Sequence, residues 1–160
     1  MSRLGDKYII TGGKALSGSV RISGAKNAIL PILAATLLTE GECVLNEVPN
    51  LSDVSVMIEI LKLLGVSAEA LEGGEAGLRT IRVCAKKLNT FEVRPQLTRA
   101  MRSSIFLMGP LLGRLGRVRV AYPGGCAIGP RPIDWHLSGL AAMGVTIVER
   151  FGYIDAETKG

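Results

Sequence analysis

One cysteine, one arginine, three glycines and three prolines share ten consecutive residues of this chain, PGGCAIGPRP at positions 123–132. Glycine and proline at this density favour a shaped loop over a packed helix or strand, and such loops often carry function. A thiol beside glycines and a cation can be partly exposed, with its reactivity set by that cation. We therefore predict that Cys126 acts as a nucleophile or proton donor, with Arg131 nearby. The alternative is an adventitious loop cysteine.

The other thiols have a different setting. Cys43 and Cys84 lie in strand-like apolar segments, where cysteine usually serves as a small buried hydrophobe. Three widely spaced cysteines, no CxxC pair and one histidine favour neither a disulfide framework nor a zinc site. We expect reduced thiols and no metal, and we expect His136 to be structural or to support a site residue rather than to be catalytic.

A second candidate for chemistry is SGAKNA, residues 23–28. A small Ser-Gly-Ala segment leads into a predicted helix that begins with Lys26 and Asn27. Free N–H groups and the positive end of the dipole at a helix start bind phosphate or carboxylate, and a lysine adds a full charge. The segment predicts an anion site. The alternative is a solvated lysine with Asn27 as the N-cap.

Two further cations are expected near the same site. By the offset of an internal repeat described below, Met101 or Arg102 falls close to the place of Lys26 in the second half, which makes Arg102 the candidate cation, although Arg94, Arg99 and Arg102 could equally form a solvated face. Arg131 precedes a predicted helix with Asp134 as its N-cap. An arginine at a helix start opposes the dipole unless an anion binds there.

The elements that position these residues follow from hydrophobic periodicity, and the first half contains four of them. The predicted strand has Cys43, Leu45 and Glu47 alternating against Val44 and Val48. The following helix is closed by Gly65 and takes its N-cap from Ser52 or Asp53. In chain order the elements are a helix at 25–38, a strand at 40–48, a helix with Val54, Met57, Ile58, Leu61 and Leu64 on one face, and a strand at 66–71.

The second half repeats this plan at an offset of about 75 residues. Its predicted elements are a helix at 99–112 that begins near Gln96 to Arg99, a strand at 116–122, a helix at 134–144 and a strand at 145–149. The paired landmarks are Leu38 with Leu112, Gly41 with Gly116, Pro49 with Pro123, and Gly65 with Gly144. The pattern predicts two copies of one α/β unit, with chance similarity of amphipathic helices as the alternative. The loop of Cys126 lies in an insertion between the last two landmarks.

Two segments remain. Residues 71–80 look like an exposed hairpin loop, to which we assign no function. Residues 149–160 end in a strand-like segment with no covering helix, so the last strand is either an exposed edge or the molecule continues elsewhere.

Composition limits the class of protein. With 160 residues, 48% hydrophobic and 21% charged, the chain can bury a core as one ordinary domain. The amino terminus lacks the apolar region of a signal peptide and no long uncharged apolar stretch is present, which predicts a cytoplasmic protein with no membrane partner. A net charge of +5 fits nucleic acid, an acidic membrane surface or anionic substrates. Aromatic residues, 4% of the chain, do not interleave with basic ones, which disfavours nucleic acid.

SGAKNA, TRAMRSSI around Arg102 and PGGCAIGPRPID together resemble the UDP-N-acetylglucosamine 1-carboxyvinyltransferases, from about Tyr8 to the end of the chain. The sister enolpyruvyl transferase that acts on shikimate 3-phosphate has a different amino-terminal motif and no such cysteine loop. The resemblance implies an α/β (α+β) fold made of βαβαββ-type units in an inside-out α/β barrel. It assigns residues 1–22 to a second domain and residues 23–160 to an incomplete first domain of two units, about 23–85 and 86–160.

The activity implied by the resemblance is transfer of the enolpyruvyl group of phosphoenolpyruvate to the 3-hydroxyl of UDP-N-acetylglucosamine, the first committed step of peptidoglycan synthesis. No metal or organic cofactor is implied. Cys126 would donate a proton to phosphoenolpyruvate and can form a covalent adduct, and fosfomycin-type epoxides alkylate the family's cysteine. Lys26 and Asn27 would bind phosphoenolpyruvate and Arg102 the nucleotide sugar. The uridine end would contact Arg131, Pro132, Ile133, Asp134 and Trp135.

Two departures from the family accompany this resemblance. Trp135 stands where a smaller aliphatic residue is usual, which affects how the uracil packs. Family members have two domains of three units each, so the carboxylate base and further arginines would lie outside these 160 residues. We therefore expect this chain alone to be inactive. The alternatives are a two-unit module that binds a nucleotide sugar without catalysis, and a basic nucleic-acid-binding module.

Overall fold

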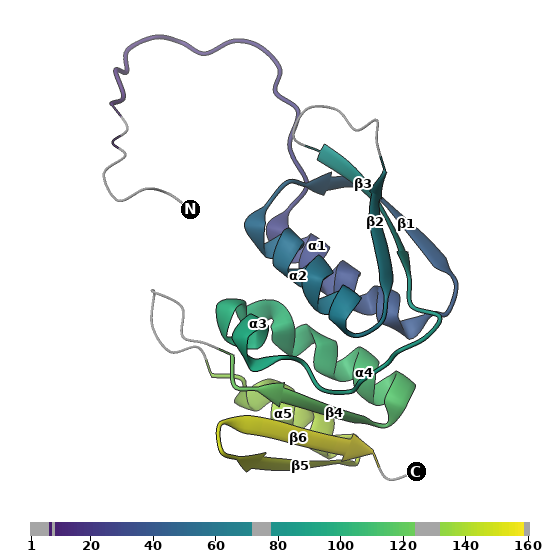
Figure 1. Cartoon of the computed structure of the whole chain (residues 1–160). Coiled ribbons are helices and arrows are strands. Elements are labelled where there is room, and N and C mark those ends of the chain that lie inside the picture. The colour runs from purple at the N-terminus through teal and green to yellow at the C-terminus, as the bar shows by residue number, and fades with distance from the viewer. Residues whose placement is uncertain (1–6, 8, 72–77, 124–131, 159–160) are drawn as a thin grey trace.

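The computed structural model describes residues 7, 9–71, 78–123 and 132–158 (Figure 1). Helices and strands alternate, as expected for the α/β class. The helices are α1 (Lys26–Ala35), α2 (Ser52–Leu63), α3 (Pro95–Ala100), α4 (Met108–Leu115) and α5 (Asp134–Ala142), with 3₁₀ helices η1 (Thr36–Leu38) and η2 (Arg102–Leu107). The strands are β1 (Glu42–Pro49), β2 (Ser67–Leu71), β3 (Leu78–Cys84), β4 (Arg117–Ala121), β5 (Val145–Arg150) and β6 (Tyr153–Thr158).

The strands form two three-stranded sheets with the same topology. Their orders are β1-β3-β2 and β4-β6-β5, and every neighbouring pair is antiparallel. The outer strands of each sheet, β1 and β2 or β4 and β5, are therefore parallel to each other. They are joined by a crossover helix, α2 in the first sheet and α5 in the second. Glu42 and Arg117, which begin β1 and β4, are about 75 positions apart, as are Leu78 and Tyr153 at the starts of β3 and β6. One arrangement of strands and helix thus occurs twice.

The final strand is not an edge, so one of the two sequence-based expectations for residues 149–160 is wrong. β6 turns back from β5 through Phe151 and Gly152 and pairs with β4 on its other side, which makes it the central strand. The outer side of β4 is also hydrogen-bonded. The backbone amide of Arg119 donates to the carbonyl of Phe91, and the carbonyl of Arg119 accepts from the backbone amide of Val93, each at 2.9 Å.

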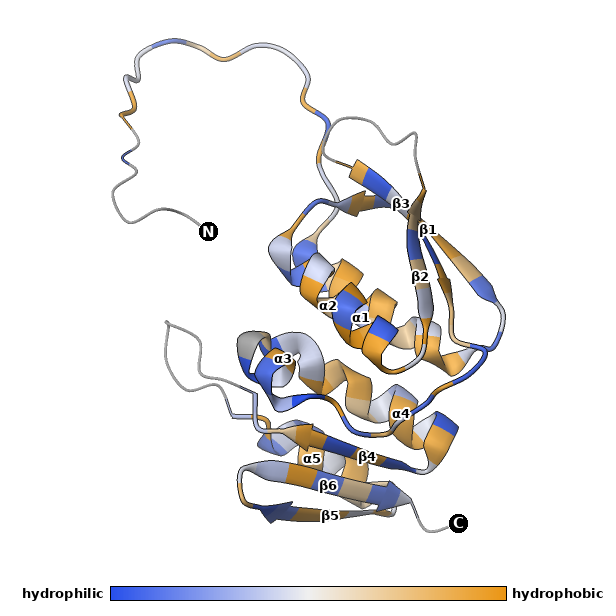
Figure 2. Ribbon diagram, in the orientation of Figure 1, coloured by the Kyte–Doolittle hydropathy of each residue, from blue (hydrophilic) through white to orange (hydrophobic). Residues whose placement is uncertain are grey.

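The core lies between the helices and the inner faces of the sheets. α1 packs against α2 and η2, and α4 packs against η1, so the helices of the two halves share one core. Figure 2 shows the hydrophobic residues of α1 and α4 along this interior. The largest fully buried side chains are Leu30, Leu33, Leu37, Met57, Ile60, Leu61, Leu64, Ile81, Leu107, Met108, Leu111 and Ile154. Each contributes about 1.5–3 kcal/mol by burial, which makes this core the main source of stability.

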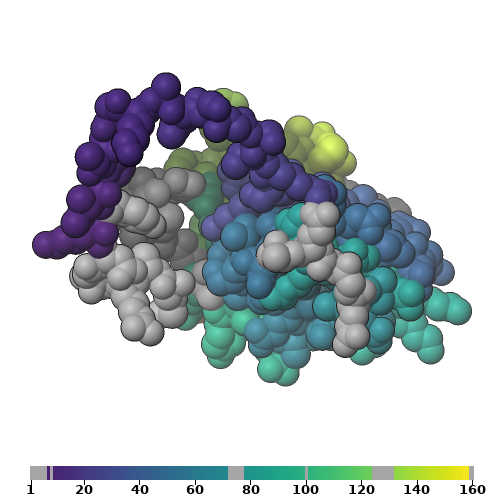
Figure 3. All heavy atoms as spheres, turned by 90° about the horizontal axis from the view of Figure 1, so that it is seen from above, coloured from purple at the N-terminus to yellow at the C-terminus, as the bar shows by residue number. Residues whose placement is uncertain are grey.

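The described part of the amino-terminal segment, before α1, lies outside this core. It runs as an extended chain that arches away from the body (Figure 3). Its apolar side chains are uncovered, namely Ile9, Ile10, Leu16, Val20 and Ile22.

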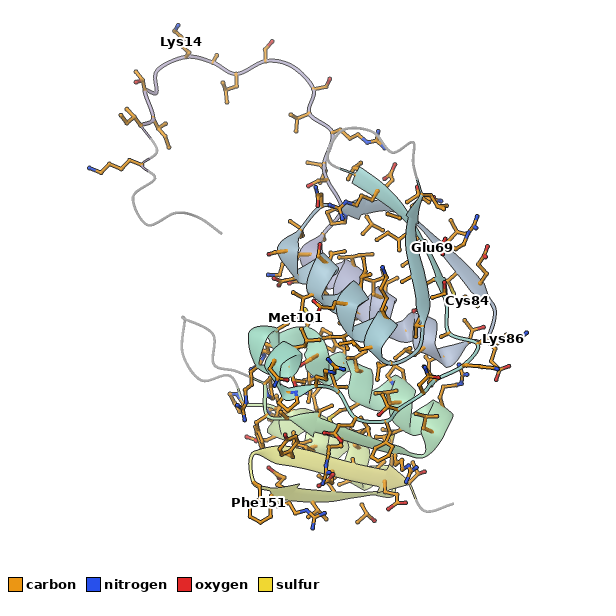
Figure 4. All side chains as sticks on the ribbon, viewed as in Figure 1. Lys14, Glu69, Cys84, Lys86, Met101 and Phe151 are labelled. Atoms are coloured by element: carbon orange, nitrogen blue, oxygen red, sulfur yellow. The ribbon has the colours of Figure 1, made fainter. Side chains whose placement is uncertain are left out.

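The helix expected at 99–112 is interrupted. Met101 is extended, with φ −142° and ψ 111°, and it separates α3 from η2 and α4. Pro110 accounts for the change from η2 to α4: it has no N–H and clashes with the preceding helical turn, so an α-helix that begins at Met108 tolerates it in its first turn. Met101 is buried, and Figure 4 shows it between α3 and the helices of the first half. Hydrophobic periodicity alone does not detect such a break.

β1 contains a β-bulge that changes which residues face the core. The register with β3 shifts between Leu45 and Val48, and Glu47 has a positive φ of 57°. An extra residue reverses the alternation from that point. Val48 is therefore buried on the face of Cys43 and Leu45, while Glu47 is exposed, which corrects the simple alternation expected from the sequence.

Arg114, near the end of α4, links the two halves of the chain. Its Nη1 donates to the carbonyl of Leu37 at 2.7 Å and its Nη2 to the carbonyl of Ala85 at 3.2 Å. The same Nη2 lies 3.5 Å from a carboxylate oxygen of Glu40, and the side chain is only 17% exposed. A mostly buried guanidinium thus binds the end of η1 and the segment after β3. Nothing in the sequence pattern indicated this role.

Gly65 is predicted to tolerate no side chain. Its φ is +99°, and a Cβ there would lie 2.7 Å from the side chain of Asn89 and 3.1 Å from its amide nitrogen. The backbone amide of Asn89 donates to the carbonyl of Leu64 at 2.8 Å, so Asn89 cannot move away freely. We expect Gly65→Ala to lower the free energy of unfolding by about 2 kcal/mol in equilibrium urea denaturation. Gly109→Ala is the control, because that helical glycine has nothing within 4 Å of its Cβ position. Equal stability of the two variants would contradict the prediction.

Candidate substrate-binding site

The start of α1 is fixed by a close contact with β1. Ala25 is extended, with φ −82° and ψ 128°, and the helix begins at Lys26. A Cβ on Gly24 would lie 2.9 Å from the carbonyl oxygen of Glu47 and 3.2 Å from Cδ of Pro49. Only glycine therefore fits where this segment crosses the bulge of β1. The contact determines where the first N–H groups of α1 lie.

Lys26 and Asn27 are exposed in the first turn of this helix. The ammonium of Lys26 forms an ion pair with the carboxylate of Asp53, in the first turn of α2. Ala25 is the N-cap and no side chain caps the helix, so the alternative in which Asn27 serves as N-cap is wrong. Free N–H groups at a helix start remain able to bind an anion beside the lysine. No side-chain cap forms on α2 either, whose N-cap is Leu51 rather than Ser52 or Asp53.

Arg102 occupies the corresponding place in the second half. It is the first residue of η2 and follows an extended residue, Met101, as Lys26 follows Ala25. Its Nη2 donates to the carbonyl of Pro132 at 3.1 Å. α1 and η2 pack together, so the elements that carry Lys26 and Arg102 are neighbours. Arg94 and Arg99 are exposed, whereas Arg102 is half-buried, which separates it from a simply solvated face.

The segment before α5 contributes the remaining described candidates. Ile133 is the N-cap of α5 and is only 2% exposed, so its side chain anchors the segment in the core. Asp134 is the first helical residue and makes no side-chain cap, which corrects the N-cap predicted from the sequence by one position. Pro132 and Asp134 are exposed, and Trp135 is 87% exposed. The carbonyl of Pro132 joins this segment to Arg102.

Cys126 and Arg131 lie outside the described residues, but both ends of their connection are placed. It runs from Tyr122 to Ile133, whereas the equivalent connection between β1 and α2 consists of Asn50 and Leu51 alone. The amide of Tyr122 donates to the carbonyl of Gly152 at 2.9 Å, and its hydroxyl donates to the carboxylate of Glu149. The other end meets Arg102 at Pro132. Hydrogen bonds thus fix the chain at both ends of the longer connection, at Tyr122 and at Pro132.

The other two cysteines differ from each other. Glu42 is paired with Cys84 and Val83 with Cys43, so the two thiols project to opposite faces of the sheet. Cys43 is half-buried and packs against the core, which agrees in part with its predicted role as a small buried hydrophobe. Cys84 is half-buried, and its thiol lies 3.7 Å from the carbonyl of Glu40, so it is not the buried core residue expected from the sequence.

His136 is exposed on α5, and its ring centroid lies 6.5 Å from that of Phe106. In the part of the chain that the structure describes, no group of three or more His, Cys, Asp or Glu side chains could hold a metal ion. No helix among the same residues is long and apolar enough to cross a membrane.

The strongest electrostatic perturbation lies elsewhere. Arg119 on β4 forms a two-pronged ion pair with Asp155 on β6, with Nε–Oδ1 2.7 Å and Nη2–Oδ2 3.2 Å. The hydrogen bond from Arg119, with weaker help from Arg150, holds the pKa of the Asp155 carboxyl below its usual value. These residues line an open depression of about 360 Å³ on the outer face of the second sheet. Because Arg119 and Arg150 are both paired with Asp155 there, this depression is not the candidate site.

The arrangement around Lys26 and Arg102 can be compared with known proteins. The family model of EPSP synthase (3-phosphoshikimate 1-carboxyvinyltransferase) matches residues 10–160. A UDP-N-acetylglucosamine 1-carboxyvinyltransferase 1 from Symbiobacterium thermophilum is 60% identical over 151 residues, which are 94% of this chain and 34% of that protein. The UDP-N-acetylglucosamine 1-carboxyvinyltransferase from Desulfosudis oleivorans is 50% identical, over 94% of this chain and 35% of that protein. The one from Cellvibrio japonicus is 46% identical, over 97% of this chain and 36% of that protein. The chain thus spans about a third of the length of these relatives.

Two solved structures share the fold. The enolpyruvyl transferase NikO from Streptomyces tendae superimposes with a TM-score of 0.73 at 24% identity, over 92% of this chain and 31% of that one. EPSP synthase from Acinetobacter baumannii gives a TM-score of 0.58 at 20% identity, over 93% of this chain and 34% of that one. The repeated strand and helix arrangement is therefore that of the enolpyruvyl transferases. Because the family model covers nearly all of the sequence, this chain belongs to the EPSP synthase family.

Proposed function

We propose that the protein containing this chain transfers the enolpyruvyl group of phosphoenolpyruvate to the 3-hydroxyl of UDP-N-acetylglucosamine and releases phosphate. The observation that carries the proposal is the name shared by relatives that are 46–60% identical to this chain over at least 94% of its length. The EPSP synthase compared above is only 20% identical. The nucleotide sugar is therefore a better-supported acceptor than shikimate 3-phosphate.

In this proposal two cationic helix starts bind the two substrates. Lys26, Asn27 and the free N–H groups of α1 bind phosphoenolpyruvate, since a phosphate gains both the lysine charge and the helix dipole. Arg102 binds the nucleotide sugar. The contact from Arg102 to the carbonyl of Pro132 supports this role, because it places the guanidinium beside the segment that we assign to the uridine end, Arg131 to Trp135.

Cys126 would supply the proton that the chemistry needs. Protonation of the methylene carbon of phosphoenolpyruvate makes its neighbouring carbon electrophilic, and the sugar hydroxyl then adds there. Loss of a proton from the resulting methyl group and of phosphate from the neighbouring carbon then re-forms the carbon–carbon double bond and gives the enol ether product. The base for the sugar hydroxyl would come from the part of the protein outside these residues. We therefore expect no turnover by the 160-residue chain alone.

The proposal extends to the rest of the protein and to the cell. The uncovered apolar residues before α1 support assigning residues 1–22 to a second domain, where they would be buried. Residues 23–160 would then be two units of the first domain, divided near residue 85. Such an enzyme would act in the cytoplasm, in peptidoglycan synthesis, and so in cell shape and division. Fosfomycin-type epoxides would alkylate its cysteine.

The activity is tested with the full-length protein. Phosphate release from phosphoenolpyruvate should require UDP-N-acetylglucosamine and should match the formation of its enolpyruvyl ether mole for mole. Absence of acceptor-dependent release by a folded full-length protein would contradict the proposal.

Trp135 provides a direct report of uridine binding, because it is the sole tryptophan of this chain and is almost fully exposed. A base that stacks on the indole should change its emission. We expect UDP-N-acetylglucosamine to quench the Trp135 fluorescence of the full-length protein, with other tryptophans of that protein replaced by phenylalanine. N-acetylglucosamine 1-phosphate, which lacks the uridine, should leave the emission unchanged. Unaltered emission at saturating UDP-N-acetylglucosamine would show that the indole does not meet the base. Quenching in the isolated chain would favour a two-unit binding module.

A further inference from the structure

Asp53 is the described residue that holds the ammonium of Lys26. The carboxylate Oδ2 of Asp53 forms an ion pair with the Nζ of Lys26. Lys26 begins α1 and Asp53 lies in the first turn of α2, and these helices pack against each other. The pair therefore joins the amino-terminal ends of two helices, where backbone N–H groups are unsatisfied.

Stability alone does not explain this pair. The side chain of Lys26 is 51% exposed and that of Asp53 is 30% exposed. Ion pairs with this much solvent access contribute little to the free energy of unfolding. An acidic residue in the first turn of α2 also gains from the helix dipole, but that gain does not need the lysine.

A fixed ammonium has a clear use in binding an anion. A lysine side chain has four rotatable bonds and loses much rotamer freedom when it is held by a ligand. A carboxylate that occupies one N–H of the ammonium restricts the side chain beforehand and leaves two N–H groups for a ligand. The ligand then meets a charge already placed beside the first N–H groups of α1.

We propose that Asp53 is a positioning residue that holds the ammonium of Lys26 at the start of α1 for an incoming phosphate group. The identification of that group as the phosphate of phosphoenolpyruvate rests on the proposed function. Binding of inorganic phosphate does not, so the two can be tested separately.

Two other acidic residues of the same region provide contrast. Glu47 forms an ion pair with Arg21 and not with Lys26. Glu59 also lies on α2, six residues beyond Asp53. Glu59→Gln therefore makes the same kind of change as Asp53→Asn on the same helix, away from Lys26, and serves as the matched control.

The experiment uses the full-length protein with Asp53→Asn, Asp53→Glu, Glu59→Gln, Lys26→Met and the Lys26→Met/Asp53→Asn double variant. We expect Asp53→Asn to raise KM for phosphoenolpyruvate and Kd for inorganic phosphate by about tenfold, the loss of one well-placed charge-assisted contact. KM for UDP-N-acetylglucosamine should stay at the wild-type value, and the unfolding midpoint should fall only slightly, because the contribution of Asp53 to the dipole of α2 is lost. Asp53→Glu should recover part of the affinity. In the Lys26→Met background Asp53→Asn should add nothing, because it acts through the lysine.

An unchanged or improved phosphate affinity in Asp53→Asn would overturn the proposal, since the carboxylate would then be idle or would compete with the anion. An equal loss in Glu59→Gln, or a loss that persists in the Lys26→Met background, would also overturn it. If the wild-type protein has no transferase activity but Asp53→Asn still weakens phosphate binding, the proposed function fails and the positioning role stands. If the wild-type protein is active and Asp53→Asn matches it in every constant, the positioning role fails alone.

Discussion

Replacing Cys126 with alanine is expected to lower kcat of the full-length protein by about 10²–10⁴-fold, the usual effect of losing a positioned general acid. Water cannot replace the thiol efficiently, because protonation at carbon needs a donor held against the methylene group. Affinity for UDP-N-acetylglucosamine should remain at the wild-type value, since Cys126 is not among the residues assigned to that substrate. Steady-state kinetics combined with the Trp135 fluorescence titration separates the two effects.

The matched controls are Cys43→Ala and Cys84→Ala, whose thiols lie on opposite faces of the first sheet and in neither substrate site. Both should retain kcat. Mass spectrometry after treatment with a fosfomycin-type epoxide should show one adduct, at Cys126. Labelling at Cys43 or Cys84 instead, or full activity of Cys126→Ala, would contradict the role given to the loop.

Arg114→Met is expected to lower the free energy of unfolding by about 3 kcal/mol, because the buried carbonyls of Leu37 and Ala85 would lose their donor. Methionine retains much of the apolar stem, so the loss reports the polar contacts. Lysine carries one ammonium in place of the forked guanidinium, so the stability of Arg114→Lys should fall between those of the wild type and Arg114→Met. Equilibrium urea denaturation measures the effect, with Arg99→Met as the control at an exposed arginine. A difference between Arg114→Met and Arg99→Met below about 0.5 kcal/mol would be within ordinary surface effects and would contradict the link between the two halves.

Local periodicity predicted much of the fold. Val54, Met57 and Leu61 are buried on one face of α2, as their spacing indicated, and Gly65 follows with a positive φ. Gly144 follows α5 with a positive φ in the same way. Gly41 and Gly116, paired as landmarks, are not equivalent, because only Gly116 adopts the left-handed conformation. Hydrophobic spacing therefore located the elements better than it located their ends.

The features that were missed depend on contacts between distant parts of the chain. The break at Met101 and the bulge at Glu47 arise where one element must fit another, whereas secondary-structure propensities describe each segment separately. Hydrophobic alternation does not reveal an extra residue in a strand until the partner strand is known. Positive φ at glutamate has no sequence signal, since residues such as glycine and asparagine usually occupy that conformation.

In the candidate site too, features of the local sequence were predictable and contacts between distant segments were not. The position of Lys26 at a helix start could be inferred from the local sequence, and the repeat indicated a cation at or near the equivalent place. That Arg102 itself begins a helix could not be inferred, because the break at Met101 that creates this start was not predicted. The ion pair of Lys26 with Asp53 and the donation from Arg102 to Pro132 could not be inferred either, because each joins elements far apart in the sequence. Trp135 was visible as an unusual residue type, but only the structure places it on the exposed side of α5.

The central claim concerns the acceptor, and a comparison of two acceptors tests it most directly. The full-length protein is incubated with phosphoenolpyruvate and either UDP-N-acetylglucosamine or shikimate 3-phosphate, and phosphate release is followed for each. A kcat/KM higher by at least about 10²-fold for UDP-N-acetylglucosamine is predicted, because a site built for one acceptor leaves polar groups unpaired with the other. A preference for shikimate 3-phosphate, or release with neither acceptor, would contradict the account.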